Sequence, residues 1–304
     1  MKTKKFLLGA LALTIGITAV VSCGSDDAAA SLPPIGGFNN ADEVAASDLV
    51  AYWPLNGSGV ESKSSTAPSQ AQNVTWVQGA KGQAAEFNLG WLKYPAISNI
   101  TNLSGSVTIS CWAKLSNTKQ TANGNSHISP LISFSGGDNT NIGNFSLFGN
   151  THGLVSSDSI QIKGEYHFKM PDGVTSFNGD CINMTKQEPW MDNTHTWNAN
   201  KVGGKWAHVV WVWDGATGNT RIYVNGVKIS NSAWESRNNG NPMPFDMFEP
   251  TTTAIGATPS IANGTNTDTW NSALKGGVDE IRIYKTLLSQ AQIGALYELE
   301  KAGR

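Results

Sequence analysis

Aromatic residues in long polar loops are the side chains of this sequence best suited to ligand chemistry. Trp190 and Trp197 lie seven residues apart in a stretch without strand-like alternation, beside Asp192 and His195, and Trp270 lies in the last long loop. A flat indole can stack on the C–H face of a pyranose ring, while carboxylate and imidazole groups hydrogen-bond its hydroxyls. These five residues predict a glycan-binding site. The alternative is that each ring packs in a small hydrophobic cluster that holds its loop down.

Glycan cleavage would need a different arrangement, in which two carboxylates face one cleft. Alternation along a strand can place such a pair on one face when the spacing is right. Asp279 and Glu280 are adjacent, so we expect them on opposite faces. Residues 165–167 (Glu-Tyr-His) have side chains that could act in glycan cleavage, but the surrounding sequence does not match that of a glycan-cleaving family. We therefore predict no catalytic residues. The alternative is a glycan-cleaving enzyme with an unrecognised carboxylate pair.

The N-terminus has the pattern of an export signal. Three lysines among the first five residues precede the apolar residues 6–21, a run too short for a comfortable membrane span. The sequence V-V-S-C that ends at Cys23 resembles the cleavage box of bacterial lipoproteins. This resemblance implies that residues 1–22 are removed and that Cys23 carries the lipid. An ordinary secretory signal with an incidental cysteine is the alternative.

The segment behind this cysteine predicts where the protein is displayed. Asp26 and Asp27 resemble the surface-export signal of Bacteroidetes lipoproteins, which implies an outer-membrane lipoprotein that faces the cell exterior. A plain acidic linker on a periplasmic lipoprotein is the alternative. Residues 23–47 are rich in Ala, Ser, Pro, Gly and Asn and lack an apolar period, so we predict a flexible tether.

Residues 205–229 predict a β-hairpin that could position such loops. Apolar side chains occupy both faces through 206–213, and turn-forming dipeptides follow at 214–215 (Asp-Gly) and 225–226 (Asn-Gly). Asn, Asp and Gly tolerate the positive φ angles of tight turns. The pattern is typical of adjacent strands in an antiparallel sheet.

Residues 276–300 predict a short apolar strand and then a helix that begins at Ser289. With the hairpin, this favours an all-β fold, a two-sheet antiparallel sandwich with a short C-terminal helix. The length from 48 to 304 suits one large sandwich domain.

Five segments, in the same order, resemble the laminin-G-like jelly-roll family within the concanavalin A-like lectin and glucanase fold: 49–55, 78–87, 106–114, 205–229 and 276–300. The resemblance implies a jelly roll and leaves the function open, because the family is functionally broad. Many relatives hold one Ca²⁺ between the first loop and the last strand. This implies Asp279 as a ligand, with Glu61 in place of the usual first-loop Asp. Alternatively, Asp279 hydrogen-bonds backbone amides without a metal.

Composition limits the partners. The net charge is −2 and only 14% of residues are charged, so no basic field attracts nucleic acid. A glycan or glycoconjugate is the expected partner, with the membrane bound through the lipid. The alternative is a protein-binding adhesion or assembly module in an outer-membrane complex. Cys111 and Cys181 could pair after export, but two unpaired thiols with Cys111 buried are favoured.

Overall fold

The computed structural model describes residues 32–117, 127–137, 139–150, 158–170, 172–173 and 176–304. The chain divides into two compact units, Met1–Pro33 and Pro34–Arg304, and the second contains every element described below. The signal sequence and Cys23 lie outside the described residues, so lipidation stays a prediction. Within the described ranges, no helix is both long enough and apolar enough to cross a membrane.

The described part of the chain is mostly β-structure. Its strands are β1 (Leu49–Trp53), β2 (Gln70–Gln78), β3 (Gln83–Tyr94), β4 (Ser104–Gly105), β5 (Val107–Leu115), β6 (Ser129–Phe134), β7 (Phe145–Gly149), β8 (Ile162–Lys169), β9 (Ser176–Ile182), β10 (Trp206–Asp214), β11 (Asn219–Val224), β12 (Val227–Lys228), β13 (Phe245–Asp246), β14 (Thr253–Ile255) and β15 (Leu274–Tyr284). Its helices are α1 (Ser98–Thr101), α2 (Pro259–Ala262), α3 (Gln290–Lys301) and the 3₁₀ turns η1 (Ala41–Glu43), η2 (Ala46–Asp48) and η3 (Ser232–Trp234).

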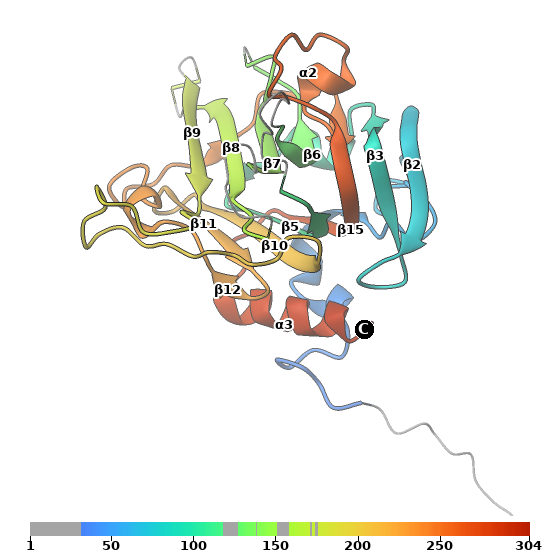
Figure 1. The fold of residues 1–304 in the computed structure, drawn as a ribbon, viewed down its shortest axis with the longest axis horizontal. Helices are drawn as coiled ribbons and strands as arrows, with labels where there is room; N and C mark the ends of the chain where they lie inside the picture. The colour runs from blue at the N-terminus through green and yellow to red at the C-terminus, as the bar shows by residue number, and fades with distance from the viewer. Residues whose placement is uncertain (1–31, 118–126, 138, 151–157, 171, 174–175) are drawn as a thin grey trace, which may run out of the picture. The chain divides into compact units, whose positions relative to one another are not determined.

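Thirteen of these strands form one long antiparallel sheet that folds into two layers, and β4 and β13 pair in a separate two-stranded sheet. The order of the long sheet is β12-β11-β10-β5-β15-β3-β14-β6-β7-β8-β9, with β1 added at β15 and β2 at β3. Figure 1 shows β6 to β9 lying over β5, β10 and β11. The predicted two-sheet sandwich is confirmed.

Aromatic side chains fill the space between the layers. Trp211 and Trp213 of β10 are fully buried and meet the opposite layer, where the ring centroids of Trp211 and Phe145 lie 4.4 Å apart and those of Trp213 and Phe168 lie 5.0 Å apart. Rings of this size bury a large apolar area and dominate the energy of such a core. The same strand buries Val210 on its other face, so β10 is covered on both sides.

The β10–β11–β12 hairpins follow the predicted turn chemistry in part. Asn225 and Gly226 have φ angles of 51° and 77°, as a tight turn between β11 and β12 requires. In the preceding turn, Gly218 and not Gly215 takes the positive φ, of 61°. Asp214 instead bonds its own turn, since Oδ1 accepts the backbone N–H of Ala216.

Helix α3 begins at the predicted Ser289. This residue and Gln292 form a reciprocal capping box that satisfies backbone N–H groups at the helix start. The helix buries Ile293, Leu296 and Leu299 in a cluster that also contains Val210 of β10. The helix therefore covers the outer face of the layer that contains β10, where Figure 1 places it.

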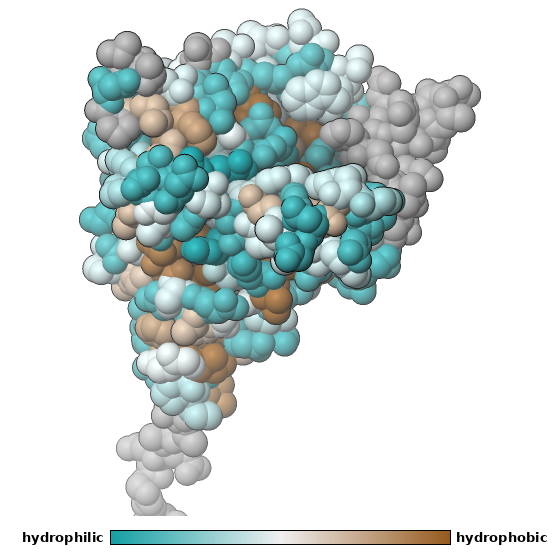
Figure 2. Space-filling model, turned by 90° about the vertical axis from the view of Figure 1, so that its left-hand side faces the viewer, coloured by the Kyte–Doolittle hydropathy of each residue, from teal (hydrophilic) through white to brown (hydrophobic). Residues whose placement is uncertain are grey.

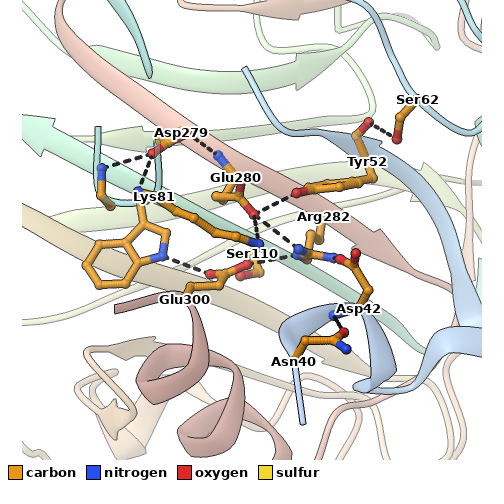
Figure 3. Close-up of polar contacts among 12 residues, drawn as sticks. Asn40, Asp42, Tyr52, Ser62, Lys81, Ser110, Asp279, Glu280, Arg282 and Glu300 are labelled. Carbon is orange, nitrogen blue, oxygen red and sulfur yellow. Dashed lines mark hydrogen bonds and ion pairs between the residues drawn. The ribbon is translucent and has the colours of Figure 1, made fainter. Parts of the chain in front are cut away.

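A buried charge network joins α3, β15 and η1. The guanidinium of Arg282 is fully buried and pairs with Glu300 at 2.8 Å, Glu280 at 3.1 Å and Asp42 at 2.7 Å (Figure 3). Its carbon Cζ lies 3.9 Å from the centroid of the Tyr52 ring. We call these five residues the charge network. Arg282 is the cation that its three carboxylates share, and Glu280 also lies 3.6 Å from Lys81. Removing Arg282 would therefore leave the buried Glu300 without its cation.

This network explains why the predicted tether of residues 23–47 differs from the structure over 34–47. Ala41 and Val44 are buried in the cluster under α3, and Asp42 is the exposed member of the network. The compact unit begins at Pro34 and not at residue 48. Sequence patterning missed this segment because it is held by contacts with residues near the other end of the chain.

A bulge in β15 corrects the prediction that Asp279 and Glu280 point to opposite faces. Val278 and Ile281 both lie in the core between the layers, so the two carboxylates between them share the outer side. The strand register shifts there, and Glu280 takes a φ of 48°. An extra residue in one strand has this effect on side-chain direction.

Candidate functional site

Trp190 and Trp197 are exposed, as a ligand-binding role requires. Their exposed fractions are 57% and 51%, among the highest of any large hydrophobic residue in the described part of the chain. Both lie in the irregular segment between β9 and β10, which contains one isolated β-bridge, between Met184 and Trp197. Neither ring packs in the core. Ligand binding by these rings stays a prediction.

Trp190 belongs to an aromatic cluster with His195 and Trp234. The two indoles are stacked, with centroids 6.2 Å apart and planes inclined by 20°. The imidazole of His195 meets both edge-on, with centroids 5.1 Å from Trp190 and 5.7 Å from Trp234. Trp234 is half-buried at the end of η3. We call these three residues the aromatic cluster.

Asn231 fixes the cluster by joining the two loops that form it. This residue is fully buried, and its side chain caps η3, where Asn is a preferred capping residue. Its Nδ2 lies 2.9 Å from Nδ1 of His195, and its Oδ1 accepts the N–H of Thr196 at 3.0 Å. Ser232 donates to the backbone oxygen of Thr194. These bonds fix the ring of His195 and the start of η3, which contains Trp234, before any ligand arrives.

The other predicted ligand residues have different places. Trp197 makes no ring contact with the aromatic cluster in the described ranges, so the stacking partner of Trp190 is Trp234. Asp192 accepts two hydrogen bonds from Thr194, first from its hydroxyl and then from its N–H, and these bonds lower the pKa of the exposed carboxyl. Trp270 is half-buried against a cluster of Ile128, Ile142 and Phe148. This contact matches the packing alternative for Trp270.

A cleft of about 430 Å³ lies beside the aromatic cluster. It is lined by Trp234 from the cluster together with Gln161, Asp180, Ile182, Met184 and Arg237. An aromatic wall beside amide, carboxylate and guanidinium groups offers both stacking and hydrogen bonding.

A second cleft, of about 610 Å³, lies on β8 and β9 and shares Asp180 and Arg237 with the first. Glu165 and Asp180 are direct cross-strand neighbours in this cleft. The ammonium of Lys163 pairs with them at 2.9 and 3.0 Å. Burial alone would lower the pKa of Lys163, but the two carboxylates outweigh it and raise the pKa. Nη2 of Arg237 donates to the backbone oxygen of Asp180 and lies 3.6 Å from the carboxylate of Asp180.

These ion pairs bear on catalysis. Glycoside hydrolysis needs one carboxyl group that is protonated and can donate to the leaving group. Glu165 and Asp180 are the only cross-strand carboxylate pair in the described lining of this cleft, and Lys163 forms an ion pair with both. This is the arrangement of an ion-paired surface that can hydrogen-bond hydroxyls.

The two carboxylates named for calcium each accept backbone N–H groups. Asp279 accepts N–H groups of Ala80 at 2.9 Å and Lys81 at 3.0 Å, as well as that of Glu280 (Figure 3). Burial raises the pKa of Asp279 to about 7, against the effect of these N–H groups.

Glu61 serves a different loop. Its carboxylate accepts the N–H groups of Tyr52, Lys63 and Ser64. Both oxygens of each carboxylate therefore already accept at least one N–H group. No group of three acidic, His or Cys side chains in the described ranges could hold a metal. The donor set therefore does not fit Ca²⁺ bound between Glu61 and Asp279.

Sequence reasoning found part of the site. Trp234 had a signal, since it is a tryptophan in a second polar loop, but the site prediction left it out. Asp180 and Arg237 had none, because their meeting depends on how β9 and the loop after η3 pack. Cys111 and Cys181 are both buried and free in the described structure, as the favoured interpretation expected.

Residues 89–294, more than half of the chain, match the concanavalin A-like lectin/glucanases superfamily. The chain belongs to this superfamily. The laminin-G-like resemblance and the jelly-roll fold are thereby confirmed. No curated protein matches the sequence.

Solved structures with the same fold are distant. The binding domain of Paraclostridial Mosquitocidal Protein 1 has a TM-score of 0.53 and 15% identity, over 83% of this chain and 52% of that one. The receptor binding domain of a botulinum neurotoxin mosaic serotype C/D has a TM-score of 0.52 and 13% identity, over 84% and 51%. The chain thus spans about half the length of these two domains. These likenesses show the fold of the superfamily.

Proposed function

We propose that this superfamily member binds glycans without cleaving them, at the aromatic cluster and the clefts beside it. The observation that carries the proposal is the stacked pair of Trp190 and Trp234, which lies next to polar clefts on two loops that Asn231 joins. A rigid exposed ring pair offers stacking area at a small cost in conformational entropy. The neighbouring carboxylate, amide and guanidinium groups can then hydrogen-bond hydroxyls and set the orientation of the ligand.

The character of the surrounding surface supports a glycan over a protein partner. Figure 2 faces the side that carries β9 and these loops, and its hydrophobic residues form separate patches among hydrophilic ones. A protein-binding module would favour a contiguous apolar patch. Polar surface with a few exposed rings suits a hydroxyl-rich ligand.

The experiment is a glycan array probed with the purified protein and with a Trp190→Ala, Trp234→Ala double variant. We expect wild type to bind at least one glycan and the variant to lose that signal. Stacking on one aromatic ring contributes about 1–3 kcal/mol, by analogy with nucleic-acid bases on aromatics. An array without any wild-type signal, or with equal signals for both proteins, would contradict the proposal.

We further propose that a lipid on Cys23 attaches the protein to the outer membrane, with the binding side available to external glycans. Anchoring many copies on one surface raises the effective affinity for a multivalent glycan. Cells that produce wild type should incorporate a radiolabelled fatty acid into the protein, and cells that produce Cys23→Ser should not. Equal label in both would contradict lipidation.

A further inference from the structure

Three clefts follow one another on this side of the molecule. The cleft at the aromatic cluster and the cleft on β8 and β9 share Asp180 and Arg237. The cleft on β8 and β9 shares Asn139 with a third cleft, of about 530 Å³, which is lined by Ser135, Gly136 and Gly137 and by loop residues near α2. Shared lining residues place each cleft next to the following one.

Arg237 stands at the first junction with hydrogen-bonding capacity to spare. Its Nη2 donates to the backbone oxygen of Asp180, and its side chain is 20% exposed. Its Nε is buried and has no hydrogen-bond partner in the described structure. A guanidinium carries five N–H donors, so the exposed part of this side chain can donate to an acceptor on a ligand.

The wall of the third cleft is built by close backbone approach. Gly136 has a φ of 135°, and a Cβ on it would lie 2.1 Å from Nδ2 of Asn144. That amide donates to the backbone oxygen of Phe248, and the hydroxyl of Ser135 accepts the N–H groups of Thr251 and Thr252. Glycine is needed where a backbone approaches so closely. These bonds tie the wall in place before binding.

Charge along the series points to an uncharged ligand. The cations Lys163 and Arg237 are already paired with Glu165 and Asp180. In the third cleft the charged residue in the described lining is Glu249, an exposed carboxylate. A site for acidic glycans would offer cations free to pair with them. Here an acidic ligand would meet unbalanced negative charge at one end.

We infer that the three clefts form one extended groove that takes an internal stretch of an uncharged polysaccharide, with the aromatic cluster at one end. This inference rests on the proposed function and specifies its ligand as a chain of several sugar units. A groove of this kind makes additional contacts as the ligand lengthens. Affinity should therefore rise from disaccharide to longer oligosaccharide until the groove is filled.

The test is calorimetric titration of the full chain with xylan, mannan and β-glucan and with their oligosaccharides of graded length. Alginate and polygalacturonate serve as acidic probes. Two exposed residues outside the aromatic cluster report on the groove, Asn178 in the cleft on β8 and β9 and Asn263 in the third cleft. Gln72, exposed on β2 in the other part of the sheet, gives the matched control.

For long ligands, Asn178→Ala and Asn263→Ala should each weaken binding about three- to tenfold, the effect of losing one hydrogen bond. For disaccharides they should change nothing, whereas Trp234→Ala should weaken binding at every length. Gln72→Ala should match wild type throughout. Binding that is independent of length, or stronger for the acidic probes, would overturn the inference while leaving glycan binding intact. Absence of binding to any probe would overturn both.

Discussion

The charge network and the aromatic cluster use aromatic and ionisable side chains in opposite ways. In the network, Arg282 and Glu300 are fully buried and satisfy each other, and the ring of Tyr52 covers the guanidinium. In the cluster, Trp190 is 57% exposed and stacks on a partner that is itself half-buried. The network closes the structure by joining both ends of the compact unit. The cluster leaves ring faces open, which is what a binding surface needs.

This contrast teaches that residue type alone does not separate a structural cluster from a ligand site. His208 illustrates the closed case, because burial, followed by the charge of Arg282, lowers its pKa to about 3 and keeps it neutral beside Ser110. His195 illustrates the open case, at the surface between two indoles. Variants in the two regions should therefore affect different measurements.

The largest expected effect is on stability, from Arg282→Ala. Removing the shared cation leaves Glu300 buried without its cation and Glu280 with the more distant Lys81 at 3.6 Å, so we expect a loss of about 3–5 kcal/mol of unfolding free energy. Chemical denaturation measures the loss. Asp42→Asn is the control, since its exposed pair should contribute about 1 kcal/mol or less. If Arg282→Ala lowered the unfolding free energy by less than about 1 kcal/mol, the network would not hold the two ends of the compact unit together.

The next effect separates two tryptophans. Trp270→Ala should lower the unfolding free energy by about 2 kcal/mol, because the ring packs against Ile128, Ile142 and Phe148. Trp190→Ala should lower it by about 0.5 kcal/mol at most, as is usual for exposed positions. Thermal and chemical denaturation of both variants decide the point. Equal losses would place Trp190 among packing residues and weaken its assignment to a site.

A small effect is also expected at Asp279. Because burial already raises the pKa of this carboxyl, Asp279→Asn should change the unfolding free energy at neutral pH by about 1 kcal/mol or less. A calcium chelator should leave the melting temperature of wild type and variant unchanged. If the chelator lowered the melting temperature of wild type but not of Asp279→Asn, Asp279 would be a calcium ligand after all, since a bound metal stabilises the native state.

Much of the fold could be predicted because its signals are local. Alternation through β10, the Asn225-Gly226 turn and the Ser289 cap each lie within a few residues of the element they specify. The bulge at Glu280 and the docking of residues 34–47 could not be predicted in this way. Both depend on contacts with Tyr52 and Arg282 that the folded sheet creates.

The candidate site was predictable only in its exposed aromatic part. Trp190 and His195 stand out because they are aromatic residues in a loop without a period. The pairing of Trp190 with Trp234 crosses two loops, and Asp180 meets Arg237 across a gap of more than fifty residues. Such meetings are properties of the packed loops, so composition and spacing could not reveal them.

Calorimetric titration of an uncharged oligosaccharide into wild type, Trp234→Ala and Val227→Ala tests the central claim most directly. Val227 is as exposed as Trp190 and lies on β12, away from the clefts. We predict that Trp234→Ala weakens binding by about 1–3 kcal/mol while the melting temperature changes little and Val227→Ala binds like wild type. Unchanged affinity in Trp234→Ala, with wild type binding the same ligand, would contradict the claim that the aromatic cluster is the binding surface.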